Sequence, residues 1–289
     1  MSYLFISVPF FLFFIFQLVP LFVSFFLSFT QYDVIHPPKF IGLENYRKIF
    51  FEDPLFWLAI KNTAVYTAGV VPTGICISLL LAVAIDQKIR FKNFFKSIFF
   101  LPTVTAMIAV SVIWKWCYAG EKYGLFNFLL MKAGFSPVDW LASPTWTLPS
   151  IMIMSVWAGI GYNMILFLAG LQTIPHTMYE AAEIDGAGFW RQFFHITLPL
   201  LRPTIIFVTM MSLIFSFQVF EQIYIMTGEM GEMGGVLNSA LTIVAYLYDQ
   251  GFQKFHMGYA SALAYIIAFC VFIITMLYKG VMKDTKVEY

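Results

Sequence analysis

The sequence predicts an all-α membrane protein with about six transmembrane helices and a polar helix–turn–helix between the fourth and the fifth. Composition is the first reason, because 60% of the 289 residues are hydrophobic, 11% are charged and the mean hydropathy is +0.80. A soluble domain carries about 25% charged residues, roughly twice this share. The second reason is that the alternating ten-residue strands of a membrane barrel do not occur, which leaves helices as the way to cross lipid.

Six apolar segments are long enough to cross a bilayer, since a spanning helix needs about 20 residues. They are residues 4–29, 62–85, 97–116, 148–172, 204–226 and 257–278. The first segment has no basic residues ahead of it and no small-residue cleavage pattern, so we expect a retained span and not a signal peptide. Prolines inside the segments are acceptable because neighbouring helices can satisfy the freed carbonyl groups. We therefore predict a single transmembrane domain over residues 1–289.

The link between the second and third segments sets the predicted orientation. Residues 86–96 carry the densest basic cluster of the chain, Lys88, Arg90, Lys92 and Lys96. Short basic loops favour the cytoplasmic side of a membrane. This rule places both termini and residues 175–203 in the cytoplasm. The opposite side then holds residues 42–56, which we expect to lie as an interfacial helix.

Charge and cysteine usage exclude several classes of partner and site. The net charge of +1 argues against a nucleic-acid partner. The three cysteines, Cys76, Cys117 and Cys270, are far apart in the sequence, so we interpret them as packed apolar side chains and not as disulfides or metal ligands. The four histidines all lie outside the predicted spans, and no metal site is predicted.

Residues 175–203 form a polar island between two apolar spans. Thr177 with Glu180 three positions later makes a capping box, which predicts the start of a helix. We expect this helix to run to about Asp185 and to end at Gly186, because glycine commonly follows the last residue of a helix. A few loop residues would be enough to join two spans. The island is therefore predicted to be a docking surface for another protein.

A second short helix is expected to follow the glycine. It would run from about Gly188 to Ile196 and stop before Pro199. Aromatic side chains recur on it at a spacing of four residues, Phe189 with Phe193 and Trp190 with Phe194, which places each pair on one face.

The island carries a recognisable signature. Glu180-Ala181-Ala182, Gly186 and Ile196-x-Leu198-Pro199 stand at the spacing of the EAA signature. In this the chain resembles the permease subunits of binding-protein-dependent ABC importers. Asp185-Gly186-Ala187 and the segments at 99–116, 216–228 and 257–265 are similar to the carbohydrate-importer branch of that family. The chain departs from the family pattern at residues 228–235, GEMGEMGG, where a Gly-Gly-Gly-Pro turn is usual.

The resemblance implies a membrane-spanning subunit of a type I ABC sugar importer in a bacterial or archaeal cell membrane. Its partners would be a second homologous permease, two cytoplasmic ATP-binding subunits, an extracytoplasmic solute-binding protein, the sugar and the lipid bilayer. Residues 175–203, called the coupling segment from here on, would enter a groove on an ATP-binding subunit. The docking residues carried over are Glu180, Ala181, Ala182, Asp185, Gly186, Phe189, Trp190, Phe193, Ile196, Leu198 and Pro199.

The chain is not expected to be an enzyme or to bind a cofactor. It contains no G-x-x-x-x-G-K-[ST] loop, so ATP and Mg²⁺ are expected on the partner ATPase. ATP binding would draw the docked segments together and turn the transport pathway from inward to outward facing, which is alternating access.

Polar residues inside spans are candidates for the substrate pathway, because lipid makes isolated polar groups costly. They are Tyr162, Asn163, Gln218, Glu221 and Gln222, to which the aromatic Phe217 is added as a stacking surface. Gln218, Glu221 and Gln222 stand at i, i+3 and i+4, which predicts one stripe on a continuous helix. Aromatic faces and amide groups suit a sugar. The alternative is that these groups only form hydrogen bonds between helices.

The sequence is compatible with two other functions. The same type of permease could carry glycerol phosphate or an amino acid, but an anionic solute calls for basic residues and the spans hold little beyond Lys115. A secondary transporter is less favoured, because such proteins show paired repeats and acidic ion sites, and here we find no repeat and a single buried acid, Glu221.

Overall fold

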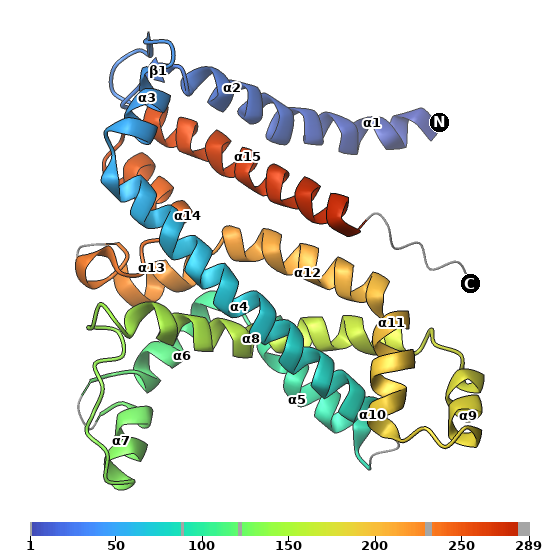
Figure 1. The fold of residues 1–289 in the computed structure, drawn as a ribbon. Coiled ribbons are helices and arrows are strands. Elements are labelled where there is room, and N and C mark those ends of the chain that lie inside the picture. The colour runs from blue at the N-terminus through green and yellow to red at the C-terminus, as the bar shows by residue number, and fades with distance from the viewer. Residues whose placement is uncertain (1, 88–89, 121–122, 229–232, 283–289) are drawn as a thin grey trace.

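Helices make up almost all of the structure. Figure 1 shows the computed structural model, which describes residues 2–87, 90–120, 123–228 and 233–282. Lys88 of the basic link and residues 229–232 of the unusual turn lie outside the described residues. The single sheet in the described part is a short antiparallel pair in which Thr30 lies opposite Phe40. The helical class predicted from composition is therefore confirmed.

The described elements follow one another in chain order. The first half contains α1 (Ser2–Phe13), η1 (Phe14–Leu18), α2 (Val19–Leu27), β1 (Thr30–Gln31), β2 (Lys39–Phe40), α3 (Glu44–Phe51), α4 (Pro54–Asp86), α5 (Lys92–Val104), α6 (Met107–Cys117) and α7 (Leu125–Lys132). The second half contains α8 (Thr147–Leu171), α9 (His176–Ile184), α10 (Phe189–Gln192), η2 (Phe193–Thr197), α11 (Leu198–Leu200), α12 (Arg202–Phe217), α13 (Glu221–Thr227), η4 (Val236–Asn238), α14 (Ile243–Tyr248), η5 (Asp249–Gln253) and α15 (Met257–Met282).

Membrane-spanning helices can be recognised among these by length and apolar composition. Within the described residues, four qualify: residues 6–27, α4, α8 and residues 257–280. Two bent pairs, α5 with α6 at 97° and residues 189–200 with α12 at 66°, raise the number to six if each pair is one span. The membrane boundaries of the six spans remain a prediction.

The segment at 97–116 differs from the single helix that its apolar run suggests. It forms α5 and α6, separated by Thr105 and Ala106 in extended conformations. Pro102 has no backbone N–H to bond the preceding turn, which weakens the end of α5. The hydroxyl of Thr105 donates to the carbonyl of Leu101 at 3.0 Å, so one of the carbonyls left open at the helix end gains a partner.

The segment at 204–226 is also broken, and this corrects the predicted stripe. Helix α12 ends at Phe217, and α13 begins only at Glu221. The intervening Phe220 has a φ of −143°, outside the helical range. Thr242 donates to the carbonyl of Val219 at 3.1 Å, which satisfies a carbonyl group in the break. A linear sequence pattern could not show this partner, because Thr242 is contributed by a distant segment.

Helices α4 and α8 cross at the centre of the molecule, and α5 lies against α8 (Figure 1). Gly161 permits the close approach of α5, because a Cβ there would lie 2.1 Å from the carbonyl oxygen of Phe99. Two hydroxyl groups bond neighbouring helices to α8. Ser78 of α4 donates to the carbonyl of Ile160 at 3.1 Å, and Thr103 of α5 donates to that of Ala158 at 3.2 Å.

The two ends of the molecule are built differently. Helix α1, the described end of α15, α9 and α10 lie at one end, whereas β1, α3, α7 and α13 lie at the other (Figure 1). The sequence prediction that both termini share a side with the coupling segment agrees with this arrangement. The N-terminal helix touches α15 through Ser24, whose hydroxyl lies 3.2 Å from that of Tyr265. The ring of Phe25 also packs against Tyr265 at 5.0 Å, and the Tyr265 hydroxyl donates to the carbonyl of Leu21. Most other side chains of residues 6–27 are exposed.

Candidate functional site

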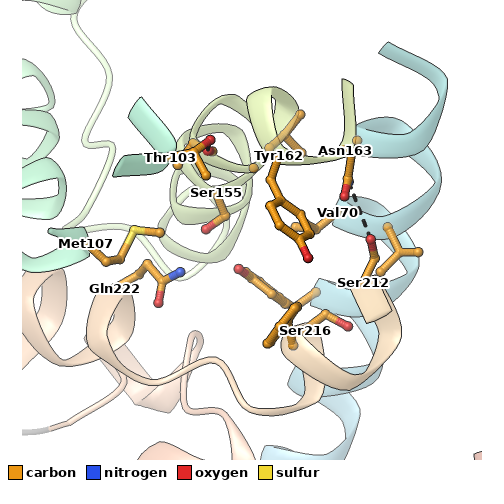
Figure 2. A pocket seen from close by; sticks show the side chains of 16 residues that line it. Val70, Thr103, Met107, Ser155, Tyr162, Asn163, Ser212, Ser216 and Gln222 are labelled. Atoms are coloured by element: carbon orange, nitrogen blue, oxygen red, sulfur yellow. Dashed lines mark hydrogen bonds between the residues drawn. The ribbon is translucent and has the colours of Figure 1, made fainter. Parts of the chain in front are cut away.

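A cavity of about 520 Å³ lies between the central helices on the side where α12 and α13 are interrupted. We call it the polar cavity. Figure 2 shows the ring of Tyr162 and the side chain of Gln222 directed into it from α8 and α13. Asn163 donates to the hydroxyl of Ser212 at 3.4 Å, which joins α8 to α12 at its edge (Figure 2). The lining residues are Tyr66, Val70, Val71, Gly74, Thr103, Met107, Ser155, Val156, Ala158, Gly159, Tyr162, Asn163, Ser212, Phe215, Ser216 and Gln222.

The wall is mostly apolar, and the hydrogen-bonding groups set into it are uncharged. Its polar atoms are hydroxyls of serine, threonine and tyrosine and amides of asparagine and glutamine. No acidic or basic side chain is among the described residues that line it. Such groups donate and accept hydrogen bonds without favouring either sign of charge. The cavity therefore suits a neutral, polyhydroxylated solute better than an ion.

The structure brings together half of the predicted pathway residues. Tyr162, Asn163 and Gln222 line the polar cavity. Phe217, Gln218 and Glu221 do not, and we withdraw them from the cavity wall. The physical reason is the break between α12 and α13, which turns Gln218 and Glu221 to the exposed surface while Gln222 points inward.

Sequence reasoning missed the small hydroxyl residues of this site. Ser155, Ser212 and Ser216 lie in spans and line the cavity together with Thr103 and Tyr66. Single serines and threonines are common in membrane helices, where they also bond their own backbone. Ser155 and Ser216 do so, to Ile151 and Leu213. Only their convergence from different helices distinguishes them, and that is a tertiary property.

The first helix of the coupling segment ends in a Schellman motif. Gly186 has a φ of +72°, a left-handed conformation that glycine and, less often, asparagine adopt without much strain. The N–H of Ala187 bonds the carbonyl of Ala182 at 2.8 Å, and that of Gly186 bonds Glu183 at 3.0 Å. The predicted break at Gly186 is thus confirmed. It ends the helix while giving the carbonyl groups of Ala182 and Glu183 hydrogen-bond partners.

The start of this helix differs from the prediction. Helix α9 begins at His176 with Pro175 as its N-cap, and no side chain caps it. Thr177 already lies inside the first turn, so the capping box with Glu180 is wrong. Pro175 supplies the extended conformation that an N-cap requires, with a ψ of 132°. The helix therefore begins before Thr177, which is too late in the chain to serve as its N-cap.

The second helix continues past Pro199, which corrects the predicted stop. Residues 189–200 are helical, with a π-helical turn, η2, from Phe193 to Thr197. The wider turn adds one residue before Pro199. This leaves room for the proline ring, so the helix continues through it. The chain bends by 66° only after Leu200, where α12 begins.

The coupling segment has an inward and an outward surface. Phe193 is only 8% exposed, and Ile196 and Leu198 pack beside it against the cores of α4 and α8. Tyr179 and Thr197 lie 3.0 Å apart through their hydroxyls and join α9 to η2. These residues attach the segment to the spans, so Phe193 is not available to a docking partner.

The outward surface carries large apolar side chains among charged ones. Ile184 is 87% exposed and Trp190 is 63% exposed, and Met178, Phe189 and Phe194 are exposed beside them. Glu180, Ala181, Asp185, Gly186 and Pro199 are also exposed, and Ala182 is half-buried. Several large apolar side chains exposed on one short segment are typical of a protein–protein contact.

A comparison with known families relates the central cavity and the coupling segment to one type of protein. Residues 74–286 match the family model of the binding-protein-dependent transport system inner membrane component. The chain belongs to this family. It is a multi-pass inner membrane protein, and it is the permease of its transport system and not the subunit that hydrolyses ATP.

Relatives of this permease support the same family. The probable ABC transporter permease protein YesP of Bacillus subtilis (strain 168) is 37% identical over 279 residues, covering 96% of this chain and 88% of the relative. The arabinooligosaccharides transport system permease protein AraP of the same organism is 35% identical, covering 95% and 86%. The lactose transport system permease protein LacF of Rhizobium radiobacter is 34% identical, covering 86% and 83%.

The fold of the permease is similar to solved structures. A bacterial ABC transporter involved in the import of the acidic polysaccharide alginate contains a chain with a TM-score of 0.86 and 24% identity, covering 99% of this chain and 96% of that chain. The same type of transporter in complex with an alginate pentasaccharide-bound periplasmic protein gives a TM-score of 0.81. At this identity the similarity describes the fold, and it agrees with an all-helical permease.

Proposed function

We propose that the permease is one of two membrane subunits of an ATP-driven importer for a neutral sugar or oligosaccharide. The observation that carries this proposal is the polar cavity, whose described lining offers hydroxyls, amides and an aromatic ring and no charge. Relatives named for arabinooligosaccharides and lactose support a carbohydrate. A fold neighbour imports an acidic polysaccharide, so the uncharged wall, and not the family, argues for a neutral solute.

Within the cavity, Tyr162, Asn163 and Gln222 are proposed to contact the solute. The ring of Tyr162 offers an apolar face to the C–H groups of a sugar ring. The amides of Asn163 and Gln222 each supply donors and an acceptor for its hydroxyls. Tyr162 and Asn163 approach the cavity from α8, and Gln222 approaches it from α13 (Figure 2). A second homologous permease would complete the pathway.

The coupling segment is proposed to dock on an ATP-binding subunit. Its exposed residues Ile184, Phe189 and Trp190 have the size and apolar character of interface anchors. The inward residues Phe193 and Tyr179 hold the segment rigidly to the spans. A movement of the docked subunit would therefore be passed to α12 and α8 as a rigid-body displacement. With two ATP-binding subunits and an extracytoplasmic binding protein that delivers the sugar, this gives alternating access.

The proposal is tested with the assembled transporter in proteoliposomes. ATP-dependent uptake is expected for a radiolabelled neutral oligosaccharide and not for a uronate oligosaccharide of equal length. Gln222→Ala should raise the KM for the neutral sugar by about 2- to 10-fold, the equivalent of one hydrogen bond of about 0.5–1.5 kcal/mol. Gln218→Ala is the matched control, because Gln218 is exposed outside the cavity.

Two results would count against this function. Preferred uptake of the uronate would show that the uncharged wall does not select the solute. Unchanged KM in Gln222→Ala, with normal assembly, would mean that Gln222 packs helices and leaves the solute to other groups.

A further inference from the structure

One face of helix α4 lines the polar cavity with side chains that become smaller along the chain. Tyr66, Val70 and Gly74 are the lining residues of this face, and they stand four positions apart. The same face meets α8 one turn later, where Ser78 donates to the carbonyl of Ile160 at 3.1 Å. Gly74 is thus the last residue of α4 on the cavity wall, and it lies just before the contact that joins α4 to α8.

Neither packing nor backbone conformation explains the glycine at position 74. Gly74 is buried, yet a Cβ at its position would meet no atom within 4 Å apart from its chain neighbours and its own helix backbone. The other glycine of α4, Gly69, is different, because a Cβ there would lie 1.9 Å from the Cε atom of Met152. Gly74 lies inside the helix and does not have a positive φ. The missing side chain therefore leaves an open space inside the protein.

This space belongs to the polar cavity, whose volume of about 520 Å³ is within the range of about 300–1,000 Å³ that is usual for ligand sites. Glycine in a helix interior is destabilising relative to alanine, but it lets a ligand approach the backbone closely. We propose that Gly74 determines the size of the solute, because its missing side chain leaves room for a second sugar ring beside Val70. The inference rests on the proposed sugar import, and it makes the permease one for disaccharides and longer sugars.

Uptake of sugars of increasing length tests this role in proteoliposomes that contain the assembled transporter. The probes are radiolabelled arabinose, arabinobiose and arabinotriose, because one relative is named for arabinooligosaccharides. Gly74→Leu places a side chain in the cavity and should lower kcat/KM for arabinotriose by about tenfold or more, while the value for arabinose changes little. Gly74→Ala should cause a smaller loss with the same dependence on length.

Ala68→Leu is the matched control, because it introduces the same side chain at an exposed position of α4 and should leave the length preference unchanged. Co-purification of the partner subunits shows whether each variant assembles. Pro72 lies two residues before Gly74, and a hinge at this place would slow the uptake of all three sugars by the same factor. An equal loss over the whole series would therefore overturn the proposal.

A thiol at position 74 tests the open space without any sugar. With the natural cysteines replaced by serine, Gly74→Cys in the assembled transporter should react with a cationic methanethiosulfonate reagent, because a water-filled cavity admits a charged reagent and a packed helix contact does not. Ser78→Cys is the control and should not react, since Ser78 is 0% exposed against α8. No reaction at position 74 would show that the space is filled in the transporter and would overturn the proposal whatever the solute is.

The uptake results separate this inference from the proposed function. Uptake of none of the three sugars by the natural chain would contradict the proposed function and the size selection together. Normal uptake with an unchanged length preference in Gly74→Leu would contradict only the role of Gly74.

Discussion

At the scale of single residues, Gly186 and Gln222 show how little the identity of a side chain says about its surroundings. Gly186 occupies a left-handed turn with no atom within 4 Å of the position of a Cβ. A side chain would therefore fit here, and the reason for a glycine is the left-handed backbone conformation. Gln222 and Gln218 are the same residue type four positions apart, yet one lines the polar cavity and the other is exposed.

Gly186→Val should weaken the association of the permease with its ATP-binding subunit. A β-branched residue in the left-handed region costs about 1–2 kcal/mol, which corresponds to roughly 5- to 30-fold in affinity if docking requires this turn. The measurement is titration of the purified ATP-binding subunit onto the permease pair in nanodiscs, together with sugar-stimulated ATP hydrolysis.

Two substitutions control for this test. Gly186→Asn should retain most of the affinity, because asparagine tolerates the left-handed conformation. Gly188→Val should also be tolerated, since Gly188 has an extended backbone with a φ of −73°. Equal affinity for Gly186→Val and the natural chain would show that the turn does not position the docking surface.

At the scale of elements, one carboxylate joins three helices at the end opposite the coupling segment. Asp53 caps α4 by accepting from the N–H of Leu55 at 2.9 Å. Its other oxygen accepts from the hydroxyls of Tyr246 on α14 and Tyr259 on α15. Burial, together with the Asp53 carboxylate, raises the pKa of Tyr246, so its hydroxyl stays protonated and continues to donate at all physiological pH values. The two bonds hold α14 and α15 against the start of α4.

Asp53→Ala should lower the thermal stability of the permease. It removes a helix cap worth about 1 kcal/mol and two hydrogen bonds to a charged acceptor, each about 1.5–3 kcal/mol. Relaxation of the tyrosines reduces the sum, and we expect a loss of about 2–4 kcal/mol. Thermal unfolding in nanodiscs, followed by tryptophan fluorescence, measures this loss.

The neighbouring Glu52→Ala is the control for Asp53. Glu52 pairs with Arg47 at 2.8 Å on the surface, where an ion pair contributes about 0–1 kcal/mol. If Tyr246→Phe in the Asp53→Ala background costs as much as it does alone, the two residues act independently and the three-helix contact is not what stabilises this end.

At the scale of the whole molecule, the two ends are predicted to lie on opposite sides of the membrane and to be reached by reagents from opposite sides. Ile184 of α9 is 87% exposed and Phe51 of α3 is 83% exposed, and the two helices lie at opposite ends (Figure 1). After the natural cysteines are replaced by serine, Phe51→Cys should react with a membrane-impermeant maleimide in intact cells. Ile184→Cys should react only after the membrane is opened. Reaction of Ile184→Cys in intact cells would place the coupling segment outside, and the proposed ATPase contact would then be impossible.

The sequence alone determined the class of the protein, its six apolar segments and the position of the coupling segment. These follow from local chemistry: lipid requires long apolar runs, and a left-handed turn such as the one at Gly186 strongly favours glycine. Predictions from local patterns were wrong where another segment of the chain satisfies the backbone groups of a broken helix, as Thr242 does for Val219. The break before Glu221 and the passage of the helix through Pro199 were not visible in the sequence.

The tertiary structure decided which polar side chains meet. The wall of the polar cavity is assembled from helices far apart in the chain, with Thr103 from α5, Ser155 from α8 and Ser216 from α12. It also decided that Phe193 is buried while Trp190 is exposed on the same short helix. The reason is that the same residue type occurs on exposed and on cavity-lining surfaces, as Val65 and Val70 of α4 show. Which of them a residue occupies depends on the packing of several helices, and no single stretch of sequence contains that information.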